Sequence, residues 1–138
     1  MLALVGLVMF SLIAVVIAQL SGFRTDAADR SLIVDQLDLR FADAGGGTVV
    51  VYDAGSSMQL LTLQPGTENF IRGVLRGMAR ERRSLQIGDQ TPFRLARHDN
   101  GRLTLEDLAT GRLIDLRAFG ATNAGSFERL LRIKDAAS

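Results

Sequence analysis

The first twenty residues constrain the architecture of this chain most strongly. The run from Leu2 to Leu20 (LALVGLVMFSLIAVVIAQL) has no charged side chain and only two polar ones. As a helix rising 1.5 Å per residue, it is roughly 30 Å long, which matches the hydrocarbon core of a bilayer. A cleaved signal peptide has a shorter apolar stretch and a small-x-small cleavage site, which Ala18–Gly22 lacks. We therefore predict an uncleaved anchor over residues 1–22, with Gly6 and Ser11 as points of close helix packing.

The flank after the apolar run does not fix the orientation of the chain in a membrane. Residues 23–31 read as a short polar linker. Within it, Phe23–Arg30 carries two Arg against two Asp, so it lacks the basic excess that retains a flank in the cytoplasm. A domain outside the cytoplasm is therefore compatible with the sequence.

Composition limits the chain beyond the linker to one small domain, which we place at residues 32–134 with a tail at 135–138. The absence of Cys excludes disulfides, iron–sulfur clusters, thiolate zinc sites and Cys nucleophiles. A formal net charge of +1 gives no support to a nucleic-acid binder.

Hydrophobic alternation and turn residues predict a β-rich domain. The expected strands cover residues 32–41, 48–52, 58–63, 93–97, 101–105 and 113–117. Asn100-Gly101 is the pair preferred in a type I′ hairpin turn. A first helix is expected after Thr67 as N-cap, with Glu68 in its first turn. A last helix is expected with Asn123 or Ser126 as N-cap.

The two halves of the domain resemble each other. Gly47–Asp53 and Gly101–Asp107 share a Gly, two apolar positions and an Asp in register, and the same offset places Gly66 on Gly120. This pattern indicates two strand–strand–strand–helix units and an α+β fold, with an antiparallel sheet, pseudo-twofold symmetry and two helices. The alternative is that two unrelated hairpins use the same turn chemistry.

The sequence contains no recognisable catalytic, cofactor-binding or metal site. His98 is the only His and lies beside a turn, where we expect it to be exposed, and no second His or Cys can complete a zinc or copper site. Asp43, Asp53 and Asp107 fall at turn positions, where Asp caps its own backbone. We therefore predict a protein that is not an enzyme and binds no cofactor of its own.

The most unusual segment is Phe70–Arg83 (FIRGVLRGMARERR). At 100° per residue, Arg72, Arg76, Arg80 and Arg83 gather on one side of a helix, and its two glycines lie between that side and the apolar face. The predicted partner-docking residues are Arg72, Gly73, Arg76, Gly77 and Arg80. Glycines spaced four apart allow a second backbone to approach closely, and the arginines can meet carboxylates or lipid phosphates. The alternative is a solvated Arg face whose glycines pack against the sheet.

Taken in chain order, the motifs resemble a known family. They are Leu39-Arg40-Phe41-x-Asp43, Gly-x-Val-x-Val-x-Asp-Ala at 47–54, Leu63-x-Pro65-Gly66, Phe70-x-Arg72-Gly73-x-x-Arg76 with Ala79-Arg80-Glu81-Arg82, Pro92-Phe93-x-Leu95, Gly101-Arg102-Leu103-x-Leu105-x-Asp107-x-x-Thr110-Gly111-Arg112, Phe119-Gly120-x-x-Asn123 and Phe127-x-x-Leu130-Leu131. No single motif is specific, but their order resembles the photosynthetic complex assembly protein (PuhC) family of purple phototrophic bacteria. The resemblance covers nearly the whole chain.

The resemblance implies a single-span protein of the inner, intracytoplasmic photosynthetic membrane with a periplasmic domain and no catalytic residues. It implies a role in assembling the reaction centre and its core light-harvesting antenna, or in remaining attached to them. The implied partners are reaction-centre subunits, core antenna polypeptides and inner-membrane lipids, with no nucleic acid. Bacteriochlorophyll, carotenoid or lipid held by these partners would be contacted from outside. Family members usually have a basic cytoplasmic tail before the span, which this sequence lacks.

We therefore expect a membrane-anchored, non-enzymatic assembly factor or accessory subunit that docks on the periplasmic face of the complex. One alternative is a pigment- or lipid-handling factor, for which His98 is the only conventional side-chain ligand to a bacteriochlorophyll magnesium. A second is an envelope hydrolase, which the lack of a nucleophile–base or metal constellation disfavours. Which subunit is contacted, and whether binding is permanent, stays open.

Overall fold

The computed structural model describes residues 31–138. The predicted anchor over residues 1–22, its packing points Gly6 and Ser11, and the linker up to residue 30 lie outside the described residues. None of the helices in the described part of the chain is long and apolar enough to span a bilayer.

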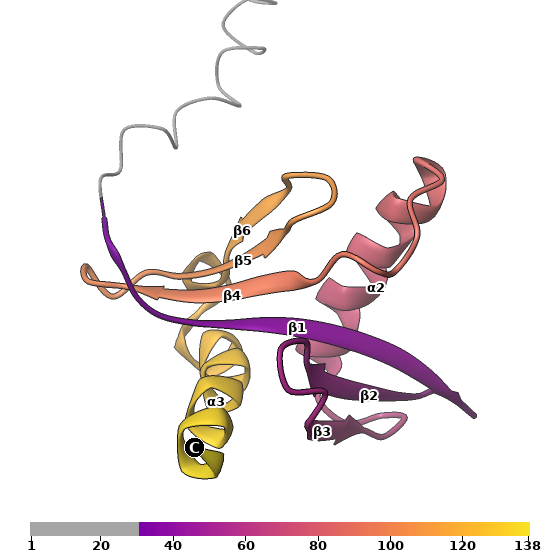
Figure 1. Ribbon diagram of the computed structural model, residues 1–138, viewed down its shortest axis with the longest axis horizontal. Coiled ribbons are helices and arrows are strands. Elements are labelled where there is room, and N and C mark those ends of the chain that lie inside the picture. Colours follow the sequence, from indigo (N-terminus) through magenta and orange to yellow (C-terminus); the bar gives the residue numbers. More distant parts are fainter. Residues whose placement is uncertain (1–30) are drawn as a thin grey trace, which may run out of the picture. The chain divides into compact units, whose positions relative to one another are not determined.

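Six strands form one antiparallel sheet in the order β3-β2-β1-β4-β5-β6 (Figure 1). The strands are β1 Ile33–Gly45, β2 Thr48–Asp53, β3 Gln59–Leu63, β4 Phe93–His98, β5 Leu103–Asp107 and β6 Leu113–Asp115. All six predicted strands are present. The last is shorter than predicted, because the chain continues from Leu116 to Phe119 as the 3₁₀ helix η2.

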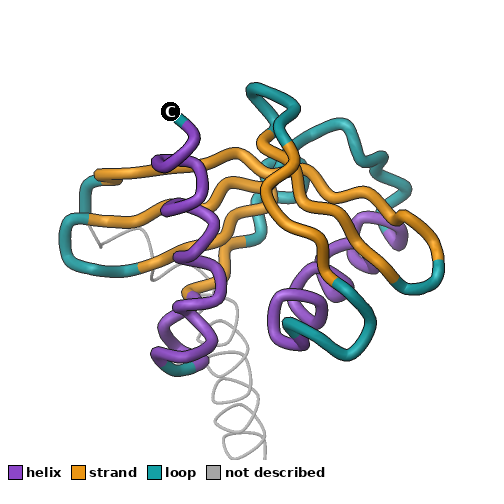
Figure 2. The backbone as a smooth tube through the Cα atoms, turned by 90° about the horizontal axis from the view of Figure 1, so that it is seen from below, coloured by secondary structure: helices purple, strands orange, loops and turns teal. Residues whose placement is uncertain are grey.

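Two α-helices, α2 (Asn69–Ser84) and α3 (Ala121–Ala137), pack against the same side of this sheet (Figure 2). Alternate strand residues such as Leu39 and Leu95 point to that side and form one core with the apolar faces of both helices. Neighbouring positions such as Asp38 and Arg94 point to the other side, where they form an ion pair at 2.8 Å. The predicted α+β domain of one antiparallel sheet and two helices is therefore confirmed.

The predicted helix caps are wrong. The Thr67 hydroxyl donates to the Gln64 carbonyl at 2.8 Å, and the first helix begins after Glu68, whose φ is 47°. Asn123 and Ser126 lie inside α3, which begins directly after Gly120. Gly120 adopts φ 93°, which glycine tolerates, so the chain turns out of η2 into α3 earlier than the polar residues suggest.

The β4–β5 hairpin also differs from the predicted type I′ turn. Only Gly101 has a positive φ (82°), whereas a type I′ turn needs positive φ at Asn100 as well. The His98 amide donates to the Arg102 carbonyl at 2.9 Å, which encloses a three-residue loop. A left-handed glycine at the end of such a loop matches the twist of the flanking strands.

The element order strand–strand–strand–helix occurs twice, with β1 and β4 adjacent at the centre of the sheet. Asp53 and Asp107 end equivalent strands and close equivalent turns. The Asp53 carboxylate accepts from the Gly55 amide, and the Asp107 carboxylate accepts from the Ala109 amide, each at 2.8 Å. This agreement supports a structural repeat over two unrelated hairpins, and it confirms the turn-capping role expected for both aspartates.

Candidate functional site

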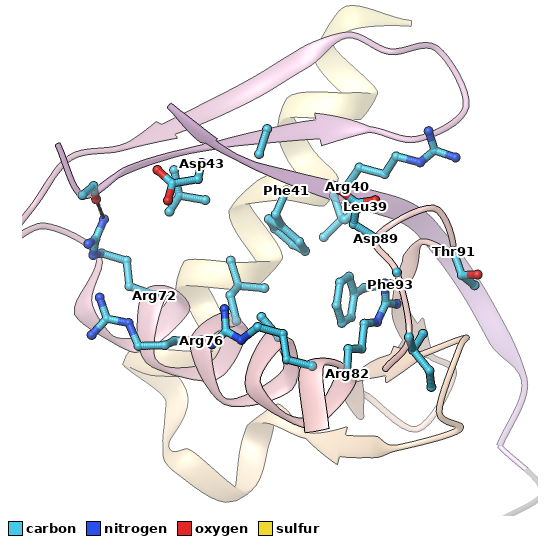
Figure 3. Close-up of a pocket in the computed structure, with 18 residues that line it drawn as sticks. Leu39, Arg40, Phe41, Asp43, Arg72, Arg76, Arg82, Asp89, Thr91 and Phe93 are labelled. Carbon is cyan, nitrogen blue, oxygen red and sulfur yellow. Dashed lines mark hydrogen bonds between the residues drawn. The ribbon is translucent and has the colours of Figure 1, made fainter. Parts of the chain in front are cut away.

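A groove of about 410 Å³ lies between α2 and the second half of β1 (Figure 3). Its apolar lining includes Leu39, Phe41, Leu75 and Phe93. The rings of Phe41 and Phe93 lie side by side, with 5.4 Å between their centroids. The volume falls within the range of about 300–1,000 Å³ that is usual for ligand sites.

Charged side chains surround this apolar floor. Those that line the groove are Arg72, Arg76, Arg82 and Arg83 from α2, Arg40 and Asp43 from β1, and Asp89 from the following loop. The spacing of α2 explains the arrangement: Ile71, Leu75 and Met78 are buried against the sheet, so Arg72, Arg76 and Arg83 follow beside them along the groove.

The predicted docking arginines have different roles in the fold. Arg72 is partly buried, and its Nη1 donates to the carbonyls of Gly47 at 2.6 Å and Leu63 at 3.1 Å, so it ties α2 to the β1–β2 turn and the end of β3. Arg76 is exposed on the groove rim. Arg80 is exposed but does not line the groove.

The two predicted docking glycines face open solvent. Gly73 and Gly77 are exposed, and a Cβ added at either would meet no other atom within 4 Å. The alternative in which these glycines pack against the sheet is therefore wrong. Their use by a partner remains a prediction.

Arg82 has a structural role that we did not predict. Its side chain is buried, and its guanidinium lies 4.0 Å from the centre of the Phe93 ring. It binds the Asp107 carboxylate through two hydrogen bonds, Nε to Oδ2 at 2.8 Å and Nη2 to Oδ1 at 2.6 Å. Its helical position, eleven residues after Ile71 on the buried face, is the sequence signal that could have identified it.

The pair shifts the acidity of Asp107. Burial by itself raises the pKa of this carboxyl, but hydrogen bonds from Arg82 and from the Ala109 and Thr110 amides lower it. The net pKa lies below the ordinary value of an aspartate. Asp107 is therefore a buried anion whose carboxylate oxygens accept hydrogen bonds from Arg82 and from the Ala109 and Thr110 amides.

His98 lies away from the groove, on the opposite side of the sheet. The expectation that it is exposed is wrong, because it is half-buried beside Thr104, and 2.9 Å separates His98 Nε2 from Thr104 Oγ1. Across residues 31–138, no three His, Cys, Asp or Glu side chains are grouped so that they could hold a metal ion.

Two comparisons connect the chain to known proteins. Residues 34–136 match a family model described as photosynthetic complex reorganisation protein PuhC. A relative from Rhodobacter capsulatus, described as an uncharacterized 17.4 kDa protein in the puhA 5′ region, is 32% identical over 140 residues, which cover 96% of this chain and 80% of the relative. No solved structure matches the chain.

Proposed function

This chain belongs to the PuhC family of photosynthetic complex reorganisation proteins, and from this membership we propose that it is a membrane-anchored, non-enzymatic assembly factor or accessory subunit of the reaction centre and its core light-harvesting antenna. The apolar run at residues 2–20 is the anchor. The folded domain docks on the periplasmic face of the complex through the exposed side of α2.

The observation that carries this proposal is the set of unpaired cations on α2. Within residues 31–138, the side chains of Arg76, Arg80 and Arg83 have no hydrogen-bond or ion-pair partner. Several other arginines of the domain do have acidic partners, among them Arg94, Arg97, Arg112 and Arg129. The fold therefore does not use the charge of these three α2 arginines, and they are available to a partner that carries carboxylates.

The composition of the groove supports binding over hydrolysis. Its lining includes Arg, Asp, Thr, Gly and apolar residues, but no His, Cys or Ser. Many hydrolases use a Ser or Cys nucleophile with a His base, and the groove lining contains none of these three residue types. Its apolar and charged side chains offer surfaces for recognition instead.

Charge reversal on α2 tests the docking surface. Arg76→Glu should lower recovery of reaction-centre and antenna polypeptides about tenfold or more, because a like-charge contact at an interface costs several kcal/mol. Tagged full-length protein would be pulled down in detergent from phototrophically grown membranes, and the recovered complexes measured by absorption spectrum and subunit mass spectrometry.

Arg132→Glu is the matched control. Arg132 is exposed on α3 and has no ion-pair partner in the described part of the chain, so its reversal makes the same change of charge away from α2. Unchanged recovery with Arg76→Glu, or an equal loss with both variants, would contradict docking through α2.

The apolar floor of the groove favours a second candidate, a pigment- or lipid-handling factor. A floor that includes Phe41 and Phe93, beneath an arginine rim, suits an apolar molecule with an anionic group. The absorption spectrum and extracted lipids of the purified protein would test it. Pigment or lipid recovered in stoichiometric amount would support this candidate, whereas protein free of both would remove it.

A further inference from the structure

Strand β1 extends well past the end of its neighbour β4. The two strands pair from Ile33 to Leu39, where β4 begins at Phe93. From Leu39 to Gly45, β1 pairs with β2 on its other side. Beyond Leu39, the side of β1 that faces away from β2 therefore has no strand partner within residues 31–138.

The register shows which backbone groups face this free edge. In an antiparallel ladder, successive residues direct their N–H and C=O groups alternately to the two sides of the strand. The Asp38 carbonyl accepts from the Ala54 amide at 2.7 Å, so Asp38, Arg40 and Ala42 direct their backbone groups toward β2. The backbone groups of Phe41 and Asp43 consequently point to the side that β4 no longer covers.

The free edge and the α2 groove occupy the same place. Residues 39–43 of β1 form one wall of the groove, and Arg72 and Arg76 lie along the opposite wall (Figure 3). Arg83, also on α2, lines the groove as well. Phe41 and Phe93 lie between the two walls on the floor. A single ligand could therefore contact the open backbone groups of Phe41 and Asp43, the apolar floor, and the unpaired guanidinium groups of Arg76 and Arg83.

We propose that an extended, acidic segment of a partner protein adds to the sheet as a strand on the free edge of β1 at Phe41–Asp43. Its backbone pairs with β1, its inward side chains cover the floor, and its carboxylates meet Arg76 and Arg83. For the identity of the partner, this proposal rests on the proposed function, since the segment would belong to a reaction-centre or antenna polypeptide.

The chemistry of the groove favours a peptide over a lipid. An open strand edge offers donors and acceptors at the spacing of another strand, and main-chain pairing beside side-chain pockets is an established mode of peptide recognition. A lipid has no matching row of amides. Asp43 and Asp89 also line the groove away from α2, which disfavours a broad anionic surface and confines negative groups to the α2 side.

The first experiment uses full-length protein in detergent and an array of overlapping ten-residue peptides that cover the reaction-centre and core antenna polypeptides. We expect binding to a small set of acidic segments with alternating apolar residues, and the affinity of the best one is then measured by fluorescence anisotropy. Arg83→Glu should weaken that affinity about tenfold, because it reverses a charge on the groove wall. Arg132→Glu, on α3, should leave it unchanged.

A second measurement tests the backbone pairing itself. Two versions of the best peptide carry N-methyl groups at alternate residues, one set at odd and one at even positions. In an added strand, the N–H groups of only one set point toward β1, and methylation removes those donors. Only one version of the peptide should therefore lose binding. Equal affinities of the two versions would overturn strand addition.

The remaining outcomes are distinct. An array without binders, or one in which basic segments bind as well as acidic ones, would overturn the proposal. Binding to phosphatidylglycerol vesicles that depends on Arg83, with no peptide bound, would overturn it in favour of a membrane surface. If the array were blank while Arg76→Glu still reduced recovery of the complex, strand addition would fail and the proposed function would stand. A blank array together with unchanged recovery of the complex in Arg76→Glu would remove the proposed function as well.

Discussion

At the scale of single residues, the buried pair between Arg82 and Asp107 distinguishes two aspartates that close the same kind of turn. Asp53 and Asp107 each accept a hydrogen bond from the amide two residues later. Only Asp107 also binds a buried guanidinium, through two hydrogen bonds. The turn role needs an acceptor oxygen, whereas the Arg82 role needs a negative charge at a buried position.

The two aspartates should therefore respond differently to the same substitution. Asp53→Asn keeps an acceptor for the turn and should change the free energy of unfolding by no more than about 0.5 kcal/mol. Asp107→Asn also keeps the turn but leaves the Arg82 charge buried without its counter-ion, and should cost about 3 kcal/mol or more. Urea unfolding of the full-length protein in detergent, followed by circular dichroism, measures both. Equal losses would show that the ion pair contributes little beyond the turn.

At the scale of elements, α2 has three different surfaces. Ile71, Leu75 and Met78 face the core, Arg72, Arg76 and Arg83 border the groove, and Gly73 and Gly77 leave an open strip of backbone. Glycine in the middle of a helix costs about 0.5–1 kcal/mol relative to alanine. Nothing in the fold uses the missing side chains, which is the physical reason to look for a partner at this strip.

Alanine at the two glycines should separate stability from docking. Gly73→Ala and Gly77→Ala should each stabilise the domain by about 0.5–1 kcal/mol, because the added methyl group meets open space. If a partner backbone lies on this strip, recovery of reaction-centre and antenna polypeptides should fall at the same time. The pull-down and urea unfolding together measure both effects.

Gly125→Ala in α3 is the matched control, since its added Cβ also meets no atom within 4 Å. It should stabilise the domain without changing recovery. Full recovery with both α2 variants would exclude close backbone approach at Gly73 and Gly77.

At the scale of the whole molecule, one core joins the two halves of the sheet. Buried residues from both halves, including Leu39 and Leu63 from the first and Leu105 and Leu131 from the second, belong to one cluster. Arg82 also links α2, in the first half, to the end of β5 in the second. Losing this pair should therefore weaken the domain as a unit.

Acid should reveal that coupling. Because the pKa of Asp107 is lower in the folded than in the unfolded protein, the unfolded state binds more protons as pH falls, and the free energy of unfolding decreases. The contribution is complete above about pH 5 and is lost as pH falls past about 4, the ordinary aspartate pKa, toward the lower folded value. Urea unfolding at pH values from 6 to 3, in steps of about half a pH unit, measures this contribution to the free energy of unfolding. Asp107→Asn should show a shallower dependence on pH, and an unchanged slope would mean that other carboxyl groups dominate.

Local pattern determined much of this protein. Side chains alternate along a strand and repeat every 3.6 residues along a helix, so the six strands, the apolar face of α2 and the turn roles of Asp53 and Asp107 could be predicted from neighbouring residues. The order of short motifs, from Leu39 to Leu131, was enough to indicate the family. The membrane anchor is also a sequence inference, and it stays a prediction.

The tertiary structure decided what depends on residues distant in the chain. Arg82 in α2 is buried with Asp107, which ends β5, as its counter-ion, and His98 is half-buried because Thr104 lies beside it on the sheet. The helices begin at other residues than predicted, because their N-caps are Glu68 and Gly120, which both adopt a positive φ. The groove lies where β1 extends beyond its pairing with β4, beside α2. Strand lengths, strand pairing and helix position are set together by the shared core rather than by any local run of sequence.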